Sequence, residues 1–207
     1  MPEAVEFRRE LVLASSNAGK LRELLAMLQP RGWIIRPQSD WAIEDAVEDG
    51  LSFLENALIK ARHAARYSGM PALGDDSGLV VDALHGEPGI YSARYAGDDA
   101  DDEANKQKLL QVMEGLERPH RGAHFYCAMA FVRHEHDPAP LIATGKWSGS
   151  ILEQALGSGG FGYDPLFWVP DLKLSSAQLA PAVKNRISHR GQALVKLAGQ
   201  MQDEFGI

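Results

Sequence analysis

Apolar residues along this chain recur at two spacings, one typical of strands and one of helices. Residues 11–14 form a short apolar run that indicates a buried strand, and the next apolar residues are spaced as on one helix face: Leu21, Leu24, Leu25 and Leu28. Ser52 and Glu55 have the form of a capping box, so a second helix is expected from there to about residue 67. The chain is therefore predicted to open with a strand, a turn and two helices.

The rest of the chain continues this alternation. Residues 73–84 are predicted to form a strand, an acidic turn and a second strand, and a third helix is expected to begin between residues 98 and 102. Alternating apolar residues over 123–132 predict a strand that opens a long hairpin ending near residue 147. A further strand is expected over residues 166–169.

Interleaved helices and strands predict an α/β fold, and the hairpin makes the predicted sheet a mixed one, flanked by helices. A last helix is expected from about Ser188, and residues 170–181 are the one segment predicted to be flexible. With 207 residues, 45% of them hydrophobic, the chain is long enough to bury a core of its own. We therefore expect a single domain over residues 1–207.

The net charge of −7 argues against non-specific binding to nucleic acid. It also means that a phosphate-bearing substrate must be held by lysines and arginines gathered at one site. Residues 1–10 lack the features of a signal peptide, and no segment approaches the ~20 apolar residues of a membrane span. Cys127 is the only cysteine, so an intramolecular disulfide is excluded and a buried strand position is expected for it. We expect a cytoplasmic protein with neither nucleic acid nor membrane as a partner.

Asp75 and Asp76 stand between apolar segments and are flanked by Gly74 and Gly78. Ionised carboxylates are rare beside a core unless a cation or hydrogen-bond donors compensate them, and Mg²⁺ is a natural compensator because it prefers oxygen ligands. The flanking glycines let the backbone turn and let a ligand come close. The same residues are typical of an ordinary acidic β-turn, so the pair alone leaves both interpretations open.

The turn after the first predicted strand offers a place for phosphate, with the residues Ser15, Ser16, Asn17, Ala18, Gly19 and Lys20. Backbone N–H groups at a helix N-terminus attract anions, Gly19 permits close approach, and Lys20 adds a positive charge. The turn is not a Walker A loop, because Ala14 and Leu21 stand where that motif has Gly and Ser or Thr. A simple helix cap with a solvated lysine is the alternative.

Two other segments carry candidate binding residues. On the second helix, Asn56 and Lys60 lie four residues apart and so on one face, with Glu48 just upstream; an ordinary amphipathic helix is the alternative. The glycine-rich loop 157–165 carries aromatic rings that can stack on a planar base and a carboxylate that can accept from a ring N–H. Its candidate residues, and those near the start of the last helix, are Phe161, Gly162, Tyr163, Asp164, Lys184, His189 and Arg190.

Other chemistry is disfavoured by spacing. The run of His and acidic residues at 134–137 falls at the predicted hairpin turn and lacks the spacing of a zinc helix. Cys127 has no nucleophile context. The segment 75–77 lacks the Asp-x-Asp-x-Thr pattern of phosphatases that form an aspartyl phosphate, so a covalent phosphoenzyme is not expected.

Taken in order, these fragments resemble the motifs of the inosine/xanthosine triphosphate pyrophosphatases, a family that removes deaminated purine nucleotides. The similarity runs from about residue 11 to residue 197. Its six motifs are Ser15-x-Asn17-x-x-Lys20, Phe53-x-Glu55-Asn56-Ala57-x-x-Lys60-Ala61, Asp75-Asp76-Ser77-Gly78-Leu79, Pro88-Gly89-Ile90-Tyr91-Ser92-Ala93-Arg94-Tyr95, Gly160-Phe161-Gly162-Tyr163-Asp164-Pro165 and Ser188-His189-Arg190-Gly191. Each fragment alone is weak, but six in one order are specific.

The resemblance implies a twisted mixed sheet in two lobes with a cleft between them, and a homodimer. It implies Mg²⁺-dependent hydrolysis of a nucleoside triphosphate such as ITP, dITP or XTP to the monophosphate and pyrophosphate. By the same resemblance residues 15–20 hold the triphosphate with help from Lys60, while Glu48 and Asp76 bind the metal. Asp76 is then the proton acceptor and Ser77 touches the substrate. The base pocket consists of residues 161–164 with Lys184, His189 and Arg190.

Some points stay open at the level of the sequence. The residues alone do not say which of Asp75 and Asp76 activates water. Family members often carry an acidic residue shortly before the lysine that matches Lys184, whereas residues 180–183 here are Ala-Pro-Ala-Val, so the support of Lys184 is not given by the motif. A pyrophosphatase for modified pyrimidine nucleotides and a nucleotide sensor without turnover are the alternative functions.

Base selectivity is expected to follow from the hydrogen-bonding edge of the purine. Hypoxanthine and xanthine present a carbonyl acceptor at C6 and an N–H donor at N1, whereas adenine presents the opposite pattern. Arg190 and Asp164 would match the first pattern and face like partners in the second. A site of this kind can reject adenine by ~10⁴-fold, because buried polar groups left unpaired are costly.

Overall fold

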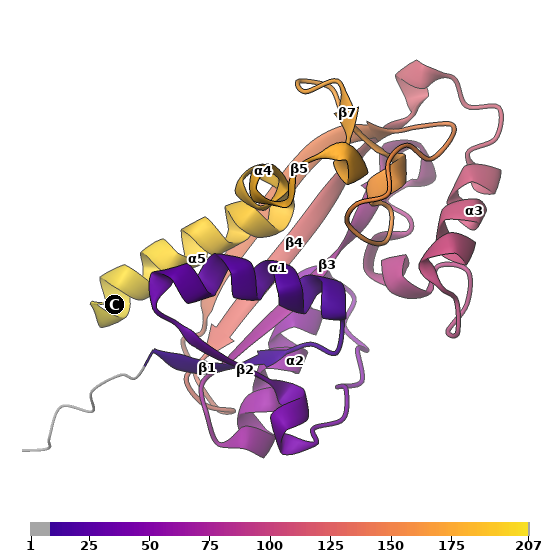
Figure 1. Cartoon of the computed structure of the whole chain (residues 1–207). Helices are drawn as coiled ribbons and strands as arrows, with labels where there is room; N and C mark the ends of the chain where they lie inside the picture. The colour runs from indigo at the N-terminus through magenta and orange to yellow at the C-terminus, as the bar shows by residue number, and fades with distance from the viewer. Residues whose placement is uncertain (1–8, 207) are drawn as a thin grey trace, which may run out of the picture.

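The structure, a computed structural model, describes residues 9–206 (Figure 1). Residues 1–8 and 207 lie outside the described residues. They include both ends of the predicted domain and most of residues 1–10, the segment that was predicted to lack a signal peptide. In chain order the strands and α-helices are β1 (Glu10–Ala14), α1 (Ala18–Leu28), β2 (Ile34–Pro37), α2 (Phe53–Ser68), β3 (Ala72–Val81), α3 (Asp102–Val112), β4 (Gly122–Val132), β5 (Leu141–Ile151), β6 (Phe167–Val169), β7 (Leu174–Ser175), α4 (Pro181–Ile187) and α5 (His189–Phe205).

One seven-stranded sheet, in the order β2-β1-β3-β4-β5-β6-β7, runs through the described part of the chain. The strands β2, β1 and β3 are parallel, and every pairing from β3 to β7 is antiparallel. The hairpin predicted over residues 123–147 is the antiparallel pair β4 and β5, which extends a few residues further at each end. The predicted α/β class with a mixed sheet is confirmed.

Helices cover both faces of this sheet (Figure 1). Side chains alternate between the faces along β1, so Leu11 and Leu13 join a buried cluster with α1 and α5. Val12 and Ala14 point the other way, into a cluster built mainly from the alanines of α2. A third cluster lies where the far halves of β3, β4 and β5 meet α3, which contributes the fully buried Leu109. The sheet alternation therefore decides which helix each strand residue faces.

The acidic segment is part of a strand and not a turn, which corrects the sequence prediction. β3 is continuous from Ala72 to Val81, and Asp75 and Asp76 lie opposite Met129 and Ala128 of β4. The flanking Gly74 is required by packing: a Cβ there would lie 2.1 Å from the carbonyl oxygen of Ala57 in α2. The glycine lets the helix backbone, and not a ligand, approach the strand.

Replacing Gly74 by Ala is expected to lower the free energy of unfolding by about 3 kcal/mol, because the added methyl group forces α2 away from β3. Urea denaturation of the variant against the wild type measures the change. Gly199→Ala is the matched control, since Gly199 is exposed on α5 with open space around it. That variant should gain up to about 1 kcal/mol from helix propensity. Equal stability of Gly74→Ala and wild type would contradict the packing argument.

Other predictions have mixed outcomes. Ser52 caps α2 as expected, accepting from the backbone N–H of Glu55 at 3.2 Å, and Ser188 caps α5 by accepting from that of Gly191. Residues 170–181 are more ordered than predicted, since they contain β7 and a 3-10 helix and end at the start of α4. No helix within residues 9–206 is long and apolar enough to cross a bilayer. The division into two lobes stays a prediction.

Candidate active site where β1 and β3 meet α1, α2 and α5

The alternation of β3 sends its two adjacent aspartates to opposite faces of the sheet. Asp75 lies on the same face as Leu73 and points toward α1 and α5, whereas Asp76 points toward α2. Each carboxylate therefore meets a different set of cations. A turn would have left the two groups side by side, so the strand geometry separates their roles.

Asp75 is fully buried and saturated with hydrogen-bond donors. Its Oδ1 accepts from Lys20 at 2.9 Å and from the hydroxyl of Ser77 at 3.1 Å, and its Oδ2 accepts from Arg190 Nε at 3.3 Å and from the thiol of Cys127 at 3.0 Å. Burial works to raise the pKa of Asp75, but the charges of Lys20 and Arg190 outweigh it and hold that pKa far below its usual value. A carboxylate so firmly ionised is a poor proton acceptor.

Asp76 has one oxygen engaged and one free. Its Oδ1 accepts from Lys60 at 2.7 Å, while its Oδ2 is buried without a hydrogen-bond partner among residues 9–206. Burial raises the pKa of Asp76 even though the ammonium of Lys60 works against it. Lys60 also contacts Glu48 at 3.2 Å; burial would lower the pKa of Lys60, but Asp76 and Glu48 outweigh it and raise that pKa. Of the two aspartates, only Asp76 presents a free oxygen.

The predicted phosphate turn leads from β1 into α1. Asn17 caps the helix by accepting from the backbone N–H of Lys20 at 3.0 Å, as the alternative interpretation of this turn requires. The lysine side chain is nevertheless not solvated, because it reaches Asp75. Ser16 donates to Asp45 at 2.6 Å. A Cβ on Gly19 would lie 2.7 Å from the ring of Phe161, so this glycine lets the glycine-rich loop pack on the turn.

Glu23 is a site residue that the sequence analysis missed. It lies one turn after Lys20 on α1, accepts from Lys184 at 2.8 Å and forms a short ion pair with Nη1 of Arg190. The expected acidic residue before Lys184 is thus replaced by one that is distant in sequence. The spacing from Lys20 placed Glu23 on the same helix face, but nothing local pointed to its partners.

The glycine-rich loop forms the other wall of the site. The ring of Phe161 lies beneath two cations, with Lys184 Nζ 4.9 Å and Arg190 Cζ 5.7 Å from its centroid. Tyr163 is buried in the core and donates its hydroxyl to the carbonyl of Ser92 at 2.9 Å. Its ring is therefore held by the protein, so the predicted stacking on a base falls to Phe161.

Asp164 is 2% exposed and engaged within the protein. One oxygen accepts from Lys184 at 2.5 Å and from the backbone N–H of Phe161 at 2.9 Å, and the other accepts from Ser176 at 2.6 Å. Because a carboxylate has about four acceptor sites, one position is left for a ligand. Direct acceptance from a base N–H stays a prediction.

His189 begins α5 with its ring stacked on Phe125 at a centroid distance of 4.8 Å. Its Nδ1 is buried and has no hydrogen-bond partner in the part of the chain that the structure describes. Burial, helped by the charge of Arg190, lowers the pKa of His189 well below its usual value, so the imidazole is neutral at neutral pH. An unpartnered buried nitrogen in a cavity wall is suited to a polar ligand atom.

The neutral His189 predicts a stability loss in mild acid. The unfolded chain binds a proton at this residue below a pKa of about 6.5, whereas the folded protein does not, so the free energy of unfolding falls as pH drops below that value. Between about pH 7 and pH 5.5 the expected loss is about 1 kcal/mol. Urea titrations at both pH values should show a loss that is larger in the wild type than in His189→Gln by about 1 kcal/mol, since other groups with shifted pKa values, such as His124, titrate in both proteins. An equal pH response of the two proteins would contradict a neutral imidazole.

Two adjoining cavities bring the predicted residues together. The first cavity has a volume of 170 Å³. The predicted site residues that line it are Asn17, Lys20, Ser77, Phe161, Gly162, Tyr163, Asp164, Lys184, His189 and Arg190. The second cavity has a volume of 260 Å³. The predicted site residues that line it are Ser15, Ser16, Asn17, Lys20, Glu48, Lys60, Asp76 and Ser77. The cavities share Asn17, Lys20, Ser77 and Ala93, so they adjoin. After the predicted ligand parts, we call the cavity with Arg190 the base-side half and the cavity with Lys60 the phosphate-side half.

Some predicted residues do not line either cavity. Ala18 and Gly19 are the first residues of α1, and Asp75 is buried behind the wall. Asn56 is fully buried and accepts from the backbone N–H of Gly50 at 2.9 Å, so it supports the loop that carries Glu48. Lining residues outside the predicted site set include Gln38, Asp45, Ile90, Ser92, Ala93, Arg94 and Asp102. Residues 90–94 belong to the motif at residues 88–95, to which the sequence assigned no role.

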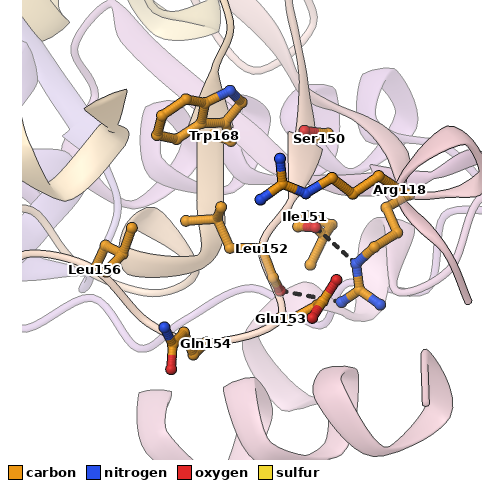
Figure 2. A pocket seen from close by; sticks show the side chains of 9 residues that line it. Arg118, Ser150, Ile151, Leu152, Glu153, Gln154, Leu156 and Trp168 are labelled. Carbon is orange, nitrogen blue, oxygen red and sulfur yellow. Dashed lines mark hydrogen bonds between the residues drawn. The ribbon is translucent and has the colours of Figure 1, made fainter. Parts of the chain in front are cut away.

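A larger cavity of 630 Å³ lies elsewhere, against the ends of β5 and β6 (Figure 2). Its wall contains Arg121, which donates to the carbonyl oxygens of Ile151 and Leu152 at 2.8 and 3.0 Å. This arginine therefore caps main-chain carbonyls. None of the predicted site residues, all of which fall within residues 9–206, lines this cavity.

Two other predictions concern residues outside the site. The run at 134–137 lies at the turn between β4 and β5 as expected, where Asp137 accepts from the side chain of Arg133. Cys127 is buried in β4 as expected, and burial raises the pKa of its thiol well above the usual value. Its hydrogen bond to Asp75 was not foreseen, because only the β3–β4 register brings the two residues together.

The sheet is open and mixed, and a two-part charged cavity lies beside β3, next to the turn between β1 and α1. These features define an α/β protein with a site suited to a base joined to phosphates. The Ham1 family model matches residues 11–200. A relative from Methylococcus capsulatus named dITP/XTP pyrophosphatase is 57% identical over 94% of this chain and 97% of its own length. One of the same name from Thioalkalivibrio sulfidiphilus is 54% identical over 93% and 98%. The chain belongs to the Ham1 family.

Solved structures agree with this assignment. A HAM1 protein from Coxiella burnetii is 46% identical and superposes with a TM-score of 0.86, covering 94% of this chain and 98% of its own. The Ham1 protein of Staphylococcus aureus is 39% identical with a TM-score of 0.83, covering 94% and 99%. The sheet and its helices are therefore those of the family.

Proposed function

We propose that this protein hydrolyses deaminated purine nucleoside triphosphates, namely ITP, dITP and XTP, to the monophosphate and pyrophosphate. The observation that carries the proposal is the free, buried Oδ2 of Asp76, a residue that lines a cavity together with Lys20 and Lys60. Such an oxygen can take a proton from an attacking water, while the lysines neutralise the charge of a polyphosphate. The names of the similar relatives support two of these substrates, dITP and XTP.

The two aspartates have different parts in this reaction. Water forms a bond to the α-phosphorus, the bond from that phosphorus to the bridging oxygen breaks, and pyrophosphate leaves. Asp76 takes the proton from the water, since burial makes it more basic than an exposed carboxylate and its Oδ2 is free. Asp75 holds Lys20 in place and takes no proton.

The donor set fits Mg²⁺. Within the described chain no group of three or more His, Cys, Asp or Glu side chains could hold a metal by itself. Mg²⁺ is nevertheless commonly bound by one or two carboxylates together with substrate phosphates, and the carboxylates of Glu48 and Asp76 in the cavity wall supply such a pair. When bound there, the ion would neutralise phosphate charge and make water more acidic.

The base-side half of the cavity favours a purine with a carbonyl at C6. Arg190 uses Nε, Nη1 and Nη2 for Asp75, Glu23 and Ser77, which leaves one hydrogen on each Nη nitrogen for a ligand acceptor. The ring of Phe161 offers a stacking surface beside it. Adenine would bring an amino group to the same place, where Arg190 offers only donors.

Pyrophosphate release tests this function. We expect release from ITP, dITP and XTP in the presence of Mg²⁺, far less from GTP, ATP and dUTP, and none when the metal is chelated. Preferred release from a modified pyrimidine nucleotide would replace the substrate class. Tight binding of ITP without release would show a nucleotide sensor instead. The homodimer and the cytoplasmic location implied by the family resemblance stay predictions, the first to be measured by analytical ultracentrifugation.

A further inference from the structure

Six charged side chains, four buried and two partly buried, form an unbroken chain from the phosphate turn to the glycine-rich loop. Cations and anions alternate along it in the order Lys20, Asp75, Arg190, Glu23, Lys184 and Asp164. The exposed fraction of these side chains nowhere exceeds 14%. Positive and negative charges balance along the chain, so any ligand charge placed at one end acts on groups that are poorly screened by solvent.

Asp75 is the carboxylate that contacts both Lys20 and Arg190. Its Oδ1 lies 2.9 Å from Lys20 Nζ, and its Oδ2 lies 3.3 Å from Arg190 Nε. Lys20 lines both cavity halves, whereas Arg190 lines only the base-side half. Asp75 itself lines neither, so it is a shared counter-ion for a phosphate-side cation and a base-side cation.

We propose that Asp75 is a positioning residue that makes base recognition and polyphosphate binding cooperative. The inference rests on the proposed function, because it takes Lys20 to face phosphate and Arg190 to face the base. A polyphosphate that neutralises Lys20 leaves the pair of Lys20 and Asp75 with a net negative charge, so the pair as a whole attracts Arg190 more strongly. The guanidinium is then held more firmly in the orientation that donates to the base, so the base binds at a smaller ordering cost. By linkage, the base strengthens polyphosphate binding by the same factor.

The experiment divides the substrate into its two halves. Calorimetry measures the affinity of inosine for the protein with and without saturating tripolyphosphate and Mg²⁺, and then the reverse titration. The wild type should bind inosine about tenfold more tightly in the presence of tripolyphosphate, within the usual range of coupling between sites. A factor below about two in the wild type would overturn the proposal by itself, whatever happens to the variants.

Two variants of the same chain of charged side chains separate positioning from general damage. Asp75→Asn should still bind each half but bring the coupling factor close to one, because Lys20 and Arg190 no longer share a charged partner. Glu23→Gln is the matched control: it removes a carboxylate that contacts Arg190 and Lys184 but not Lys20. It should weaken inosine binding and keep the coupling factor. A full coupling factor in Asp75→Asn would refute the role of Asp75.

Turnover of ITP by the same wild-type preparation distinguishes failure of this inference from failure of the proposed function. Normal pyrophosphate release without coupling between the halves would overturn the inference alone. Absence of release would overturn the proposed function, and the coupling factors would still decide whether Asp75 links the two halves of the cavity. If Asp75→Asn does not fold, the wild-type coupling factor remains the deciding measurement.

Discussion

Asp76→Asn is expected to lower kcat for ITP by about 10³-fold or more and to change nucleotide affinity by less than about threefold. The amide keeps the shape of the side chain and its contact with Lys60, but it cannot accept a proton from water. It also weakens the carboxylate pair that would hold the metal. Single-turnover kinetics give the rate, and equilibrium binding of ITP to the inactive variant gives the affinity.

Glu55→Gln is the control for this experiment. Glu55 is a nearby carboxylate whose Oε2 accepts from the backbone N–H of Leu51 and the hydroxyl of Ser52, so it caps α2 and lines neither half of the cavity. The Gln variant should keep kcat within about threefold of the wild type, because Glu55 does not line the cavity and is not the general base. A normal kcat in Asp76→Asn would eliminate Asp76 as proton acceptor and as metal ligand.

Arg190→Ala is expected to have two large effects. The ratio of kcat/KM for ITP to that for ATP should fall by about 10²-fold or more, because the donor that matches the C6 carbonyl is gone. The free energy of unfolding should fall by about 3 kcal/mol, since Asp75 and Glu23 lose a shared partner in a buried place. The substrate ratio comes from pyrophosphate release, and the stability from urea denaturation.

Arg190→Lys separates these effects. A lysine keeps the positive charge between Asp75 and Glu23, so most of the stability should be retained, but it cannot reproduce the planar fork that also reaches Ser77. The preference for ITP over ATP should still fall. If the folded Arg190→Lys protein kept the wild-type preference, recognition of the base would have to lie with other residues of the pocket.

Some of the site was visible in the sequence because its signals are local. The cap at Asn17, the spacing of Lys60 on α2, and the aromatic residues of the glycine-rich loop each depend on a few neighbouring residues. The same local reasoning misjudged β3, because Asp and Gly next to one another are typical of turns. Packing against the backbone of α2 and pairing with β4 overrode that preference.

Glu23 shows what local reasoning does not reach. It lies in an ordinary helical segment, and its partners Lys184 and Arg190 are 161 and 167 residues away along the chain. The family motif places the support of Lys184 in the residues just before it. The structure supplies that support from the opposite end of the chain, across the face of the sheet that α1 and α5 share.

The sequence by itself determined the α/β class, the starts of α2 and α5 and most of the charged residues that gather at the site, because periodicity, capping and residue chemistry act over a few positions. Only the tertiary structure decided how the charges pair. The alternation of a strand sends Asp75 and Asp76 to opposite faces of the sheet, where different helices supply the cations. One carboxylate is thereby saturated and the other keeps a free oxygen, and this difference separates positioning from proton transfer.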